Sequence, residues 1–66
     1  MEALKEILKE YNTTKQKVAQ INDFIVSEKF DELDETSKLL IVQKYDSLYN
    51  YEEALKAILI YNNALN

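Results

Sequence analysis

Residues 27–37, SEKFDELDETS, are the stretch of sequence that decides the fold of this 66-residue chain. On either side of it, apolar residues recur with the 3-4 spacing of an amphipathic helix, and within it that pattern stops and restarts in a new phase. The stretch therefore predicts a corner, over residues 28–34, between two long antiparallel helices. Four acidic residues lie in the corner, but without the glycine and the ligand spacing of a calcium loop, so we expect a solvated surface and no bound metal.

The segment before the corner predicts one long helix over about residues 2–27. Three consecutive residues of weak helix propensity, Asn12 to Thr14, interrupt it, but the stripe keeps its phase across them and favours a continuous helix. One face of this helix is apolar or aromatic at six of seven positions, which are Leu4, Ile7, Tyr11, Thr14, Val18, Ile21 and Ile25.

The segment after the corner predicts a second helix over about residues 35–64, with Asp34 as its N-cap and Phe30 and Leu33 folded back over the helix ends. This helix carries two stripes, offset by one position around it. The first comprises Ile41, Tyr45, Leu48, Glu52, Leu55, Leu59 and Asn62. The second comprises Leu40, Lys44, Ser47, Tyr51, Ala54, Ile58, Tyr61 and Leu65.

The two stripes predict self-association. We expect one all-α domain, residues 1–66, in which the first stripe packs on the preceding helix. The second stripe would then face water in an isolated hairpin, and an apolar strip of that length usually marks a partner surface. A core of 66 residues is also marginal by itself. The sequence therefore predicts a homo-oligomeric helical bundle, most simply a dimer.

Composition narrows the function classes. The absence of Cys and His removes disulfides, thiolate and imidazole catalysis and the commonest zinc sites, so we expect no enzyme and no cofactor. A net charge of −4, with every basic residue a lysine, argues against nucleic acid. No apolar run approaches the length of a membrane span or of a signal peptide's apolar region, so we expect no membrane partner and a cytoplasmic location.

Residues 18–61 resemble small helical proteins of crAss-like phages. The matching positions include an aromatic residue and a serine before the corner, F-x-x-L followed by an acidic residue within it, and LL, glutamine and tyrosine after it. They are Phe24, Ser27, Phe30, Leu33, Leu39, Leu40, Gln43, Tyr51 and Leu55. The resemblance implies a phage accessory protein acting in the host cytoplasm. By analogy of class, it implies anti-defence activity: an oligomeric sponge that sequesters a nucleotide immune signal such as a cyclic dinucleotide or a cyclic ADP-ribose isomer.

A ligand of that kind needs aromatic faces, phosphate donors and sugar-binding groups, and the middle of the hairpin offers them. An antiparallel register places Lys17 near Tyr45, Thr14 near Leu48 and Tyr11 near Tyr51. The candidate ligand-binding residues are Tyr11, Thr14, Lys17, Lys38, Lys44, Tyr45, Tyr49, Tyr51 and Glu52.

Two alternatives stand beside the ligand site. Tyrosine hydroxyls and Glu52 can satisfy each other across a subunit interface and fix its register, as polar core residues do in coiled coils. The chain can also be a protein-interaction module that binds a host or phage protein through its second apolar stripe.

Overall fold

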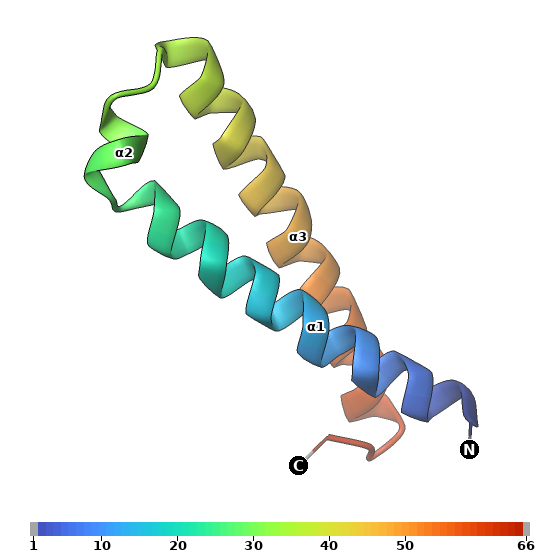
Figure 1. Cartoon of the computed structure of the whole chain (residues 1–66). Coiled ribbons are helices and arrows are strands. Elements are labelled where there is room, and N and C mark those ends of the chain that lie inside the picture. Colours follow the sequence, from blue (N-terminus) through green and yellow to red (C-terminus); the bar gives the residue numbers. More distant parts are fainter. Residues whose placement is uncertain (1, 66) are drawn as a thin grey trace.

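The structure is a computed structural model that describes residues 2–65. It consists of helices α1 (Glu2–Ile25), α2 (Glu28–Asp31) and α3 (Glu35–Tyr61), with no strand among the described residues. α1 and α3 run antiparallel and pack on each other, while the short α2 lies at the corner between them (Figure 1). The predicted all-α hairpin is thus confirmed, as an elongated body of 46 × 17 × 15 Å.

α1 is continuous through its weakest segment. The Thr13 hydroxyl donates to the Lys9 carbonyl at 3.0 Å, so this side chain bonds within the helix and does not break it. Tyr11, Thr14 and Val18, from the predicted stripe, are the buried residues of α1. The apolar period therefore predicted both the continuity and the inward face of this helix.

The corner is more ordered than the sequence suggested. α1 ends at Ile25, two residues before the predicted end, and α2 occupies part of the predicted loop. The cause is Ser27, the N-cap of α2, whose hydroxyl donates to the Phe24 carbonyl and accepts from the Phe30 N–H at 3.4 Å. Phe30 is buried, as expected for a plug over the helix ends.

α3 begins at the predicted residue. The Asp34 carboxylate accepts from the Ser37 N–H at 3.3 Å and from the Ser37 hydroxyl at 2.6 Å. The hydroxyl bond, followed by the backbone bond, lowers the pKa of Asp34 below its usual 3.8.

The end of α3 differs from the prediction. The helix stops at Tyr61, and Asn63 has a positive φ of 55°. The Ala64 N–H donates to the Leu59 carbonyl at 2.8 Å and the Asn63 N–H to the Ile60 carbonyl at 3.0 Å, the two bonds of a Schellman motif. Asparagine takes the left-handed position usually held by glycine, which this chain lacks.

This reversal changes the role of the last residues. Ala64 and Leu65 fold back against the cluster of Tyr11, Leu55 and Leu59. Leu65, expected in the second stripe, therefore pads the core. In the cluster, Tyr11 packs with Leu55 and Leu59, which lie four and eight positions beyond its predicted neighbour Tyr51, while Tyr51 itself interacts with Glu10.

Candidate functional site

A groove lies between α1 and α3 in the corner half of the molecule. The two helices are close at the end that holds the core cluster and diverge toward α2 (Figure 1). The side chains between them leave two adjoining hollows of about 220 and 310 Å³. The groove thus results from the angle between the helices and not from a loop.

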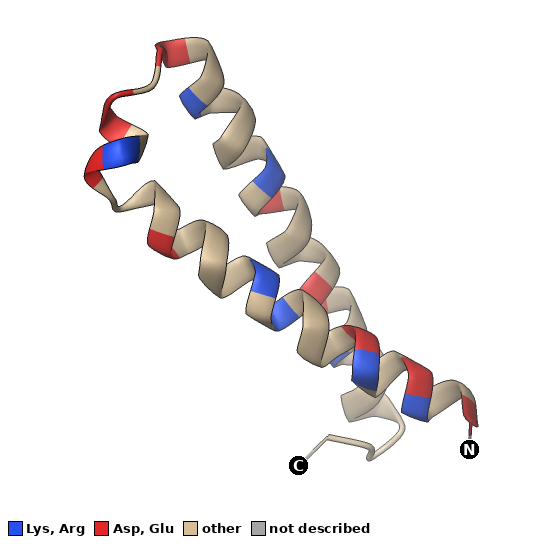
Figure 2. Ribbon diagram, in the orientation of Figure 1, with Lys and Arg blue, Asp and Glu red and all other residues tan. Residues whose placement is uncertain are grey.

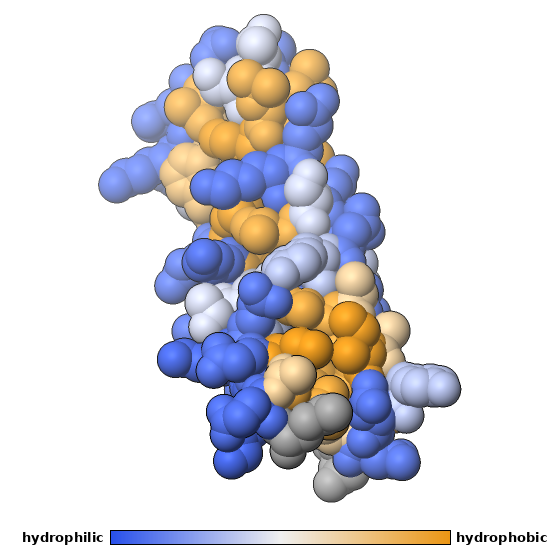
Figure 3. Space-filling model, turned by 90° about the vertical axis from the view of Figure 1, so that its right-hand side faces the viewer, coloured by the Kyte–Doolittle hydropathy of each residue, from blue (hydrophilic) through white to orange (hydrophobic). Residues whose placement is uncertain are grey.

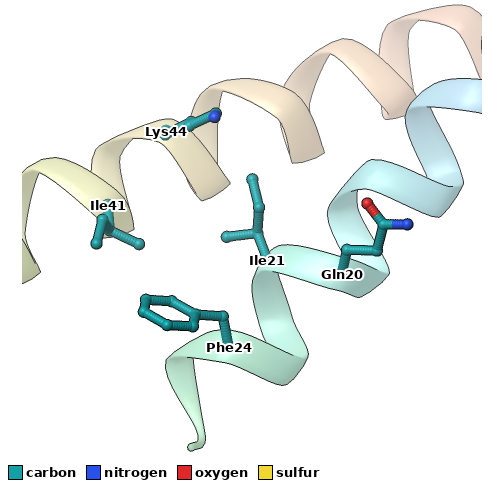
Figure 4. A pocket seen from close by; sticks show the side chains of 5 residues that line it. All are labelled: Gln20, Ile21, Phe24, Ile41 and Lys44. Atoms are coloured by element: carbon teal, nitrogen blue, oxygen red, sulfur yellow. The ribbon is translucent and has the colours of Figure 1, made fainter. Parts of the chain in front are cut away.

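The floor of the groove is apolar and its rim is polar. Ile21 and Phe24 of α1 point toward Ile41 of α3, while Gln20 and Lys44 lie at the edges (Figure 4). The larger hollow shares Gln20, Ile21 and Lys44 and adds two further residues, Lys17 and Leu48.

Lys17 and Lys44 are the two candidate ligand residues that the structure places at this groove. Both side chains are exposed, and they line the same hollow from opposite helices. The one ion pair within residues 2–65 joins Lys38 to Glu35 at 3.6 Å, so neither groove lysine has a carboxylate partner there. Two cations beside an apolar floor suit an anionic ligand with an apolar part.

The predicted tyrosines do not gather at the groove. Tyr45 and Tyr49 stack on each other, with ring centroids 6.2 Å apart and planes inclined by 13°. At 100° per residue they lie about 100° and 140° around α3 from Lys44. The stack therefore lies beyond the Ile41 side of the groove, and neither ring lines the two hollows.

The remaining candidates are also dispersed. Tyr11 and Thr14 are buried. Glu52 is half-buried at its predicted stripe position. Tyr51 is exposed, and side-chain hydrogen bonding with Glu10, more than burial or charge, raises its pKa above 10.0.

Lys38 lies near the corner, where its amine is 6.0 Å from the centre of the Phe30 ring and pairs with Glu35. These contacts are those of a surface residue that covers the buried Phe30 side chain. Of the nine candidates, the structure brings together Lys17 with Lys44 and Tyr45 with Tyr49.

Sequence reasoning missed Gln20 as a groove residue, together with the floor that Ile21, Phe24 and Ile41 provide. Lys17, Gln20 and Phe24 follow a 3-4 spacing on one flank of α1, which is the signal that could have indicated them. The divergence of the helices, which opens that flank, has no sequence signal.

The outer surface of α3 carries most of the exposed large hydrophobic residues of the described chain. We define the α3 face as the exposed second-stripe residues, which are Leu40, Lys44, Ser47, Tyr51, Ala54, Ile58 and Tyr61. Leu40 is 58% exposed, Ile58 42% and Tyr61 87%. All seven residues are exposed, as predicted for the second stripe of a hairpin, although Lys44 also lines the groove and Tyr51 also interacts with Glu10 of α1.

Apolar exposure is very unequal between the two helices. Of nine exposed large hydrophobic residues in the described chain, eight belong to α3, one is Val26 in the corner, and none belongs to α1. Charged residues instead alternate along the first half of α1 and collect at the corner, while long uncharged stretches run along α3 (Figure 2). Hydrophobic surface is visible toward both ends of the molecule (Figure 3).

The described side chains of residues 2–65 contain no cluster of three or more Asp or Glu residues arranged to hold a metal. No helix in that part of the chain has the length and hydropathy needed to cross a membrane.

The chain was compared with known proteins by sequence and by fold. It matches no protein-family model, no curated protein and no solved structure.

Proposed function

We propose that this chain is a protein-interaction module that binds its partner through the α3 face. The observation that carries the proposal is the unequal apolar exposure of the two helices. Eight of the nine exposed large hydrophobic residues of the described chain lie on α3, and four of them, Leu40, Tyr51, Ile58 and Tyr61, belong to the α3 face, while the first half of α1 is charged. Contiguous exposed apolar surface on a small protein marks an interaction site, because keeping it in water costs free energy.

The arrangement of charge on α3 supports the same function. Six of its seven charged residues lie off the α3 face by helical geometry, which leaves Lys44, at the edge toward the groove, as the one charge on it. Depletion of charge is the compositional mark of an interface core, and tyrosine is enriched there. The face carries two tyrosines, Tyr51 and Tyr61.

α1 has a supporting role in this proposal. Its apolar stripe packs on α3 through Tyr11, Leu55 and Leu59, and its other side meets solvent. It thereby holds α3 as a long straight helix, which α3 could not maintain by propensity alone.

Site-specific photo-crosslinking in cells that express the full chain tests the function. We expect a photo-reactive phenylalanine in place of Tyr51 to crosslink to a protein, because Tyr51 lies at the centre of the α3 face. The same group in place of Gln16, exposed on α1, should give no product. Ile58→Glu should abolish the Tyr51 crosslink, and Ile60→Glu should not, because Ile60 lies off the face. Equal crosslinking from both helices, or from neither, contradicts the proposal.

A second candidate function is supported by the groove lysines. Lys17 and Lys44 line one hollow of about 310 Å³, at the lower end of the size range of ligand sites. Together with the resemblance to phage accessory proteins, they favour sequestration of a nucleotide immune signal. The phosphate would bind the lysines and the base would lie on the apolar floor of Ile21 and Leu48.

A thermal-shift series tests this second function. A ligand that binds the folded chain raises its melting temperature by mass action. We expect cyclic dinucleotides or cyclic ADP-ribose isomers to do so, and Lys17→Ala and Lys44→Ala to remove the shift while Lys5→Ala, on the far part of α1, keeps it. The absence of a shift with all of these nucleotides removes the candidate and leaves the interaction module.

A further inference from the structure

We infer that the partner at the α3 face is a second copy of this chain, bound antiparallel to the first across a two-fold axis. This inference rests on the proposed interaction function and names its partner. Four observations carry it: the accessible area, the shape, the charge on the face, and the sizes of the residues that a two-fold axis would bring together.

The accessible area of one chain is too large for its mass. It is 5147 Å², whereas the scaling of surface with mass gives roughly 4,400 Å² for a folded monomer of 7.8 kDa. The excess is about 750 Å², close to the ~800 Å² that each partner buries in an interface of standard size. One such interface would lower the exposed surface of each chain to about that of a folded monomer of the same mass.

The shape leads to the same conclusion. The radius of gyration is 14.6 Å, against about 11 Å for a compact domain of this length. The body is nearly three times as long as it is wide, at 46 × 17 × 15 Å. Lateral pairing of two such rods makes a thicker and more compact body, whereas end-to-end association would lengthen it.

The charge on the face favours a copy over a charged partner. A heterologous partner is commonly selected by complementary charge, and the α3 face has only Lys44 to offer. The chain as a whole carries −4, so two copies repel least where they meet on a surface without acidic residues. The α3 face is such a surface, because the acidic residues of α3 lie elsewhere around the helix.

Lys44 also decides the direction of pairing. In a parallel pair, each Lys44 would lie beside its own copy in the seam, and two like charges would be buried together. An antiparallel pair centred between Ser47 and Tyr51 places Lys44 opposite Ala54 of the partner subunit. The two lysines are then about 15 Å apart along the axis, at 1.5 Å per residue. Antiparallel helices also oppose their dipoles.

The same centring matches large side chains with small ones. Tyr51 falls opposite the partner's Ser47, and Leu40 falls opposite the partner's Ile58. A tyrosine ring can thus occupy the space above a serine, and the apolar residues near both ends of the seam meet each other, which is the alternation that close packing needs.

The α3 face lies about a quarter turn around α3 from the side that packs on α1. Two copies joined by this face would therefore place both α1 helices on the outside of an α3–α3 pair, as a four-helix bundle. In that arrangement the charged side of α1 stays in water.

Sedimentation equilibrium of the purified chain at about 10 µM tests the partner. We expect a mass of 15.6 kDa, twice 7.8 kDa. Ile58→Glu and Leu40→Glu should reduce it to that of one chain, because each places a carboxylate in the seam. Ile60→Glu is the matched control, with the same residue type, helix and charge change, and it should stay dimeric.

Circular dichroism separates loss of pairing from loss of folding. If folding needs the dimer, Ile58→Glu loses helicity and the unmodified chain melts at a temperature that rises with concentration. Loss of helicity in the variant, with a melting temperature independent of concentration in the unmodified chain, overturns the inference.

Disulfide trapping tests whether the two chains pair antiparallel or parallel. Only the introduced cysteines can form disulfides, because the chain has no cysteine of its own. When Leu40→Cys and Ile58→Cys chains are mixed and oxidised, antiparallel pairing gives a mixed disulfide. Parallel pairing gives each chain bonded to its own kind, because positions 40 and 58 are about 27 Å apart along one helix. Predominance of the like-to-like products overturns the antiparallel arrangement.

The failure of this inference is distinguishable from that of the proposed function. A monomer that still crosslinks from Tyr51 to a different protein overturns the second copy and keeps the interaction module. A monomer with no Tyr51 crosslink overturns both.

Discussion

Phe24 and Phe30 meet edge to face at the corner, with ring centroids 6.0 Å apart and planes inclined by 87°. The hydroxyl of Ser27 bonds to the backbones of the same two residues, accepting from one and donating to the other. The pair therefore joins the end of α1 to α2, at the end of the molecule where α1 and α3 diverge.

Phe30→Ala should destabilise the fold strongly. Phe30 is 9% exposed, and truncating a buried phenylalanine removes its apolar burial and leaves a cavity. We expect the free energy of unfolding to fall by about 3 kcal/mol, measured by urea titration with circular dichroism. Lys29→Ala, next to it on an exposed position, should change little. Equal losses in the two variants would show that Phe30 does not plug the corner.

Substitutions of Leu59 and Ile60 test which side of α3 faces α1. Leu59 is 0% exposed and Ile60 is 53% exposed, although they are neighbours of nearly the same size. Leu59→Ala should lower the free energy of unfolding by about 3 kcal/mol, and Ile60→Ala by less than about 0.5 kcal/mol. The reverse order would mean that α3 is rotated from the position described here. Urea denaturation of both variants under identical conditions is the measurement.

Asp34 should make stability depend on pH at the acidic end. Hydrogen bonds with Ser37 lower the pKa of Asp34 below its usual 3.8 in the folded chain. The unfolded chain then binds the proton more readily, so the contribution is complete above 3.8 and disappears as the pH falls through the folded pKa.

Asp34→Asn supplies the control, because asparagine also caps helices but does not titrate. We expect the melting temperature of the unmodified chain, measured relative to that of Asp34→Asn, to decrease as the pH falls below 3.8. A difference that is constant from neutral to acidic pH would show that the carboxylate charge contributes nothing.

Asn63 should tolerate glycine but not a β-branched residue. Its φ of 55° is in the left-handed region, which strains a side chain branched at Cβ. Asn63→Val should lower the free energy of unfolding by about 1 kcal/mol, and Asn63→Gly should preserve or raise it. Thermal melts of both variants decide this, and equal losses would argue against the helix-ending motif.

Glu52 should make the fold less stable than an apolar residue would at the same position. It is half-buried at a position of the first stripe where its neighbours along the stripe are apolar. Glu52→Leu should raise the free energy of unfolding by about 1 kcal/mol, since half of a leucine side chain would leave water. Glu53→Leu, at the adjacent exposed position, should give no such gain. A loss with Glu52→Leu would instead show that the carboxylate makes an interaction essential to the fold.

The helices could be predicted because their signals are local. The 3-4 spacing around Tyr11 and Leu55 depends only on the helical period, and the Asp34 cap depends on residues three apart. The end of α3 was missed because Asn63 replaces the usual glycine, and three asparagines near a terminus are equally typical of a frayed helix. The short α2 was missed because four residues show no period.

The candidate site was predicted less well than the fold. Residues were grouped by their height along the hairpin, and of the nine candidates the structure places Lys17 and Lys44 at one groove. Height along the hairpin does not specify where a residue lies around its helix, so Tyr45 and Tyr49 were expected beside the lysines although neither lines the groove.

The sequence by itself determined two long helices, the corner between them, the inward face of each helix and the outward apolar stripe of α3, because all of these follow from spacing along one chain. Only the tertiary structure decided which neighbours the inward residues have, that Leu65 folds back on the core, and that the helices diverge to open a groove. Those features depend on the angle and offset at which two helices pack. Many side chains set these together, and no short stretch of sequence encodes them.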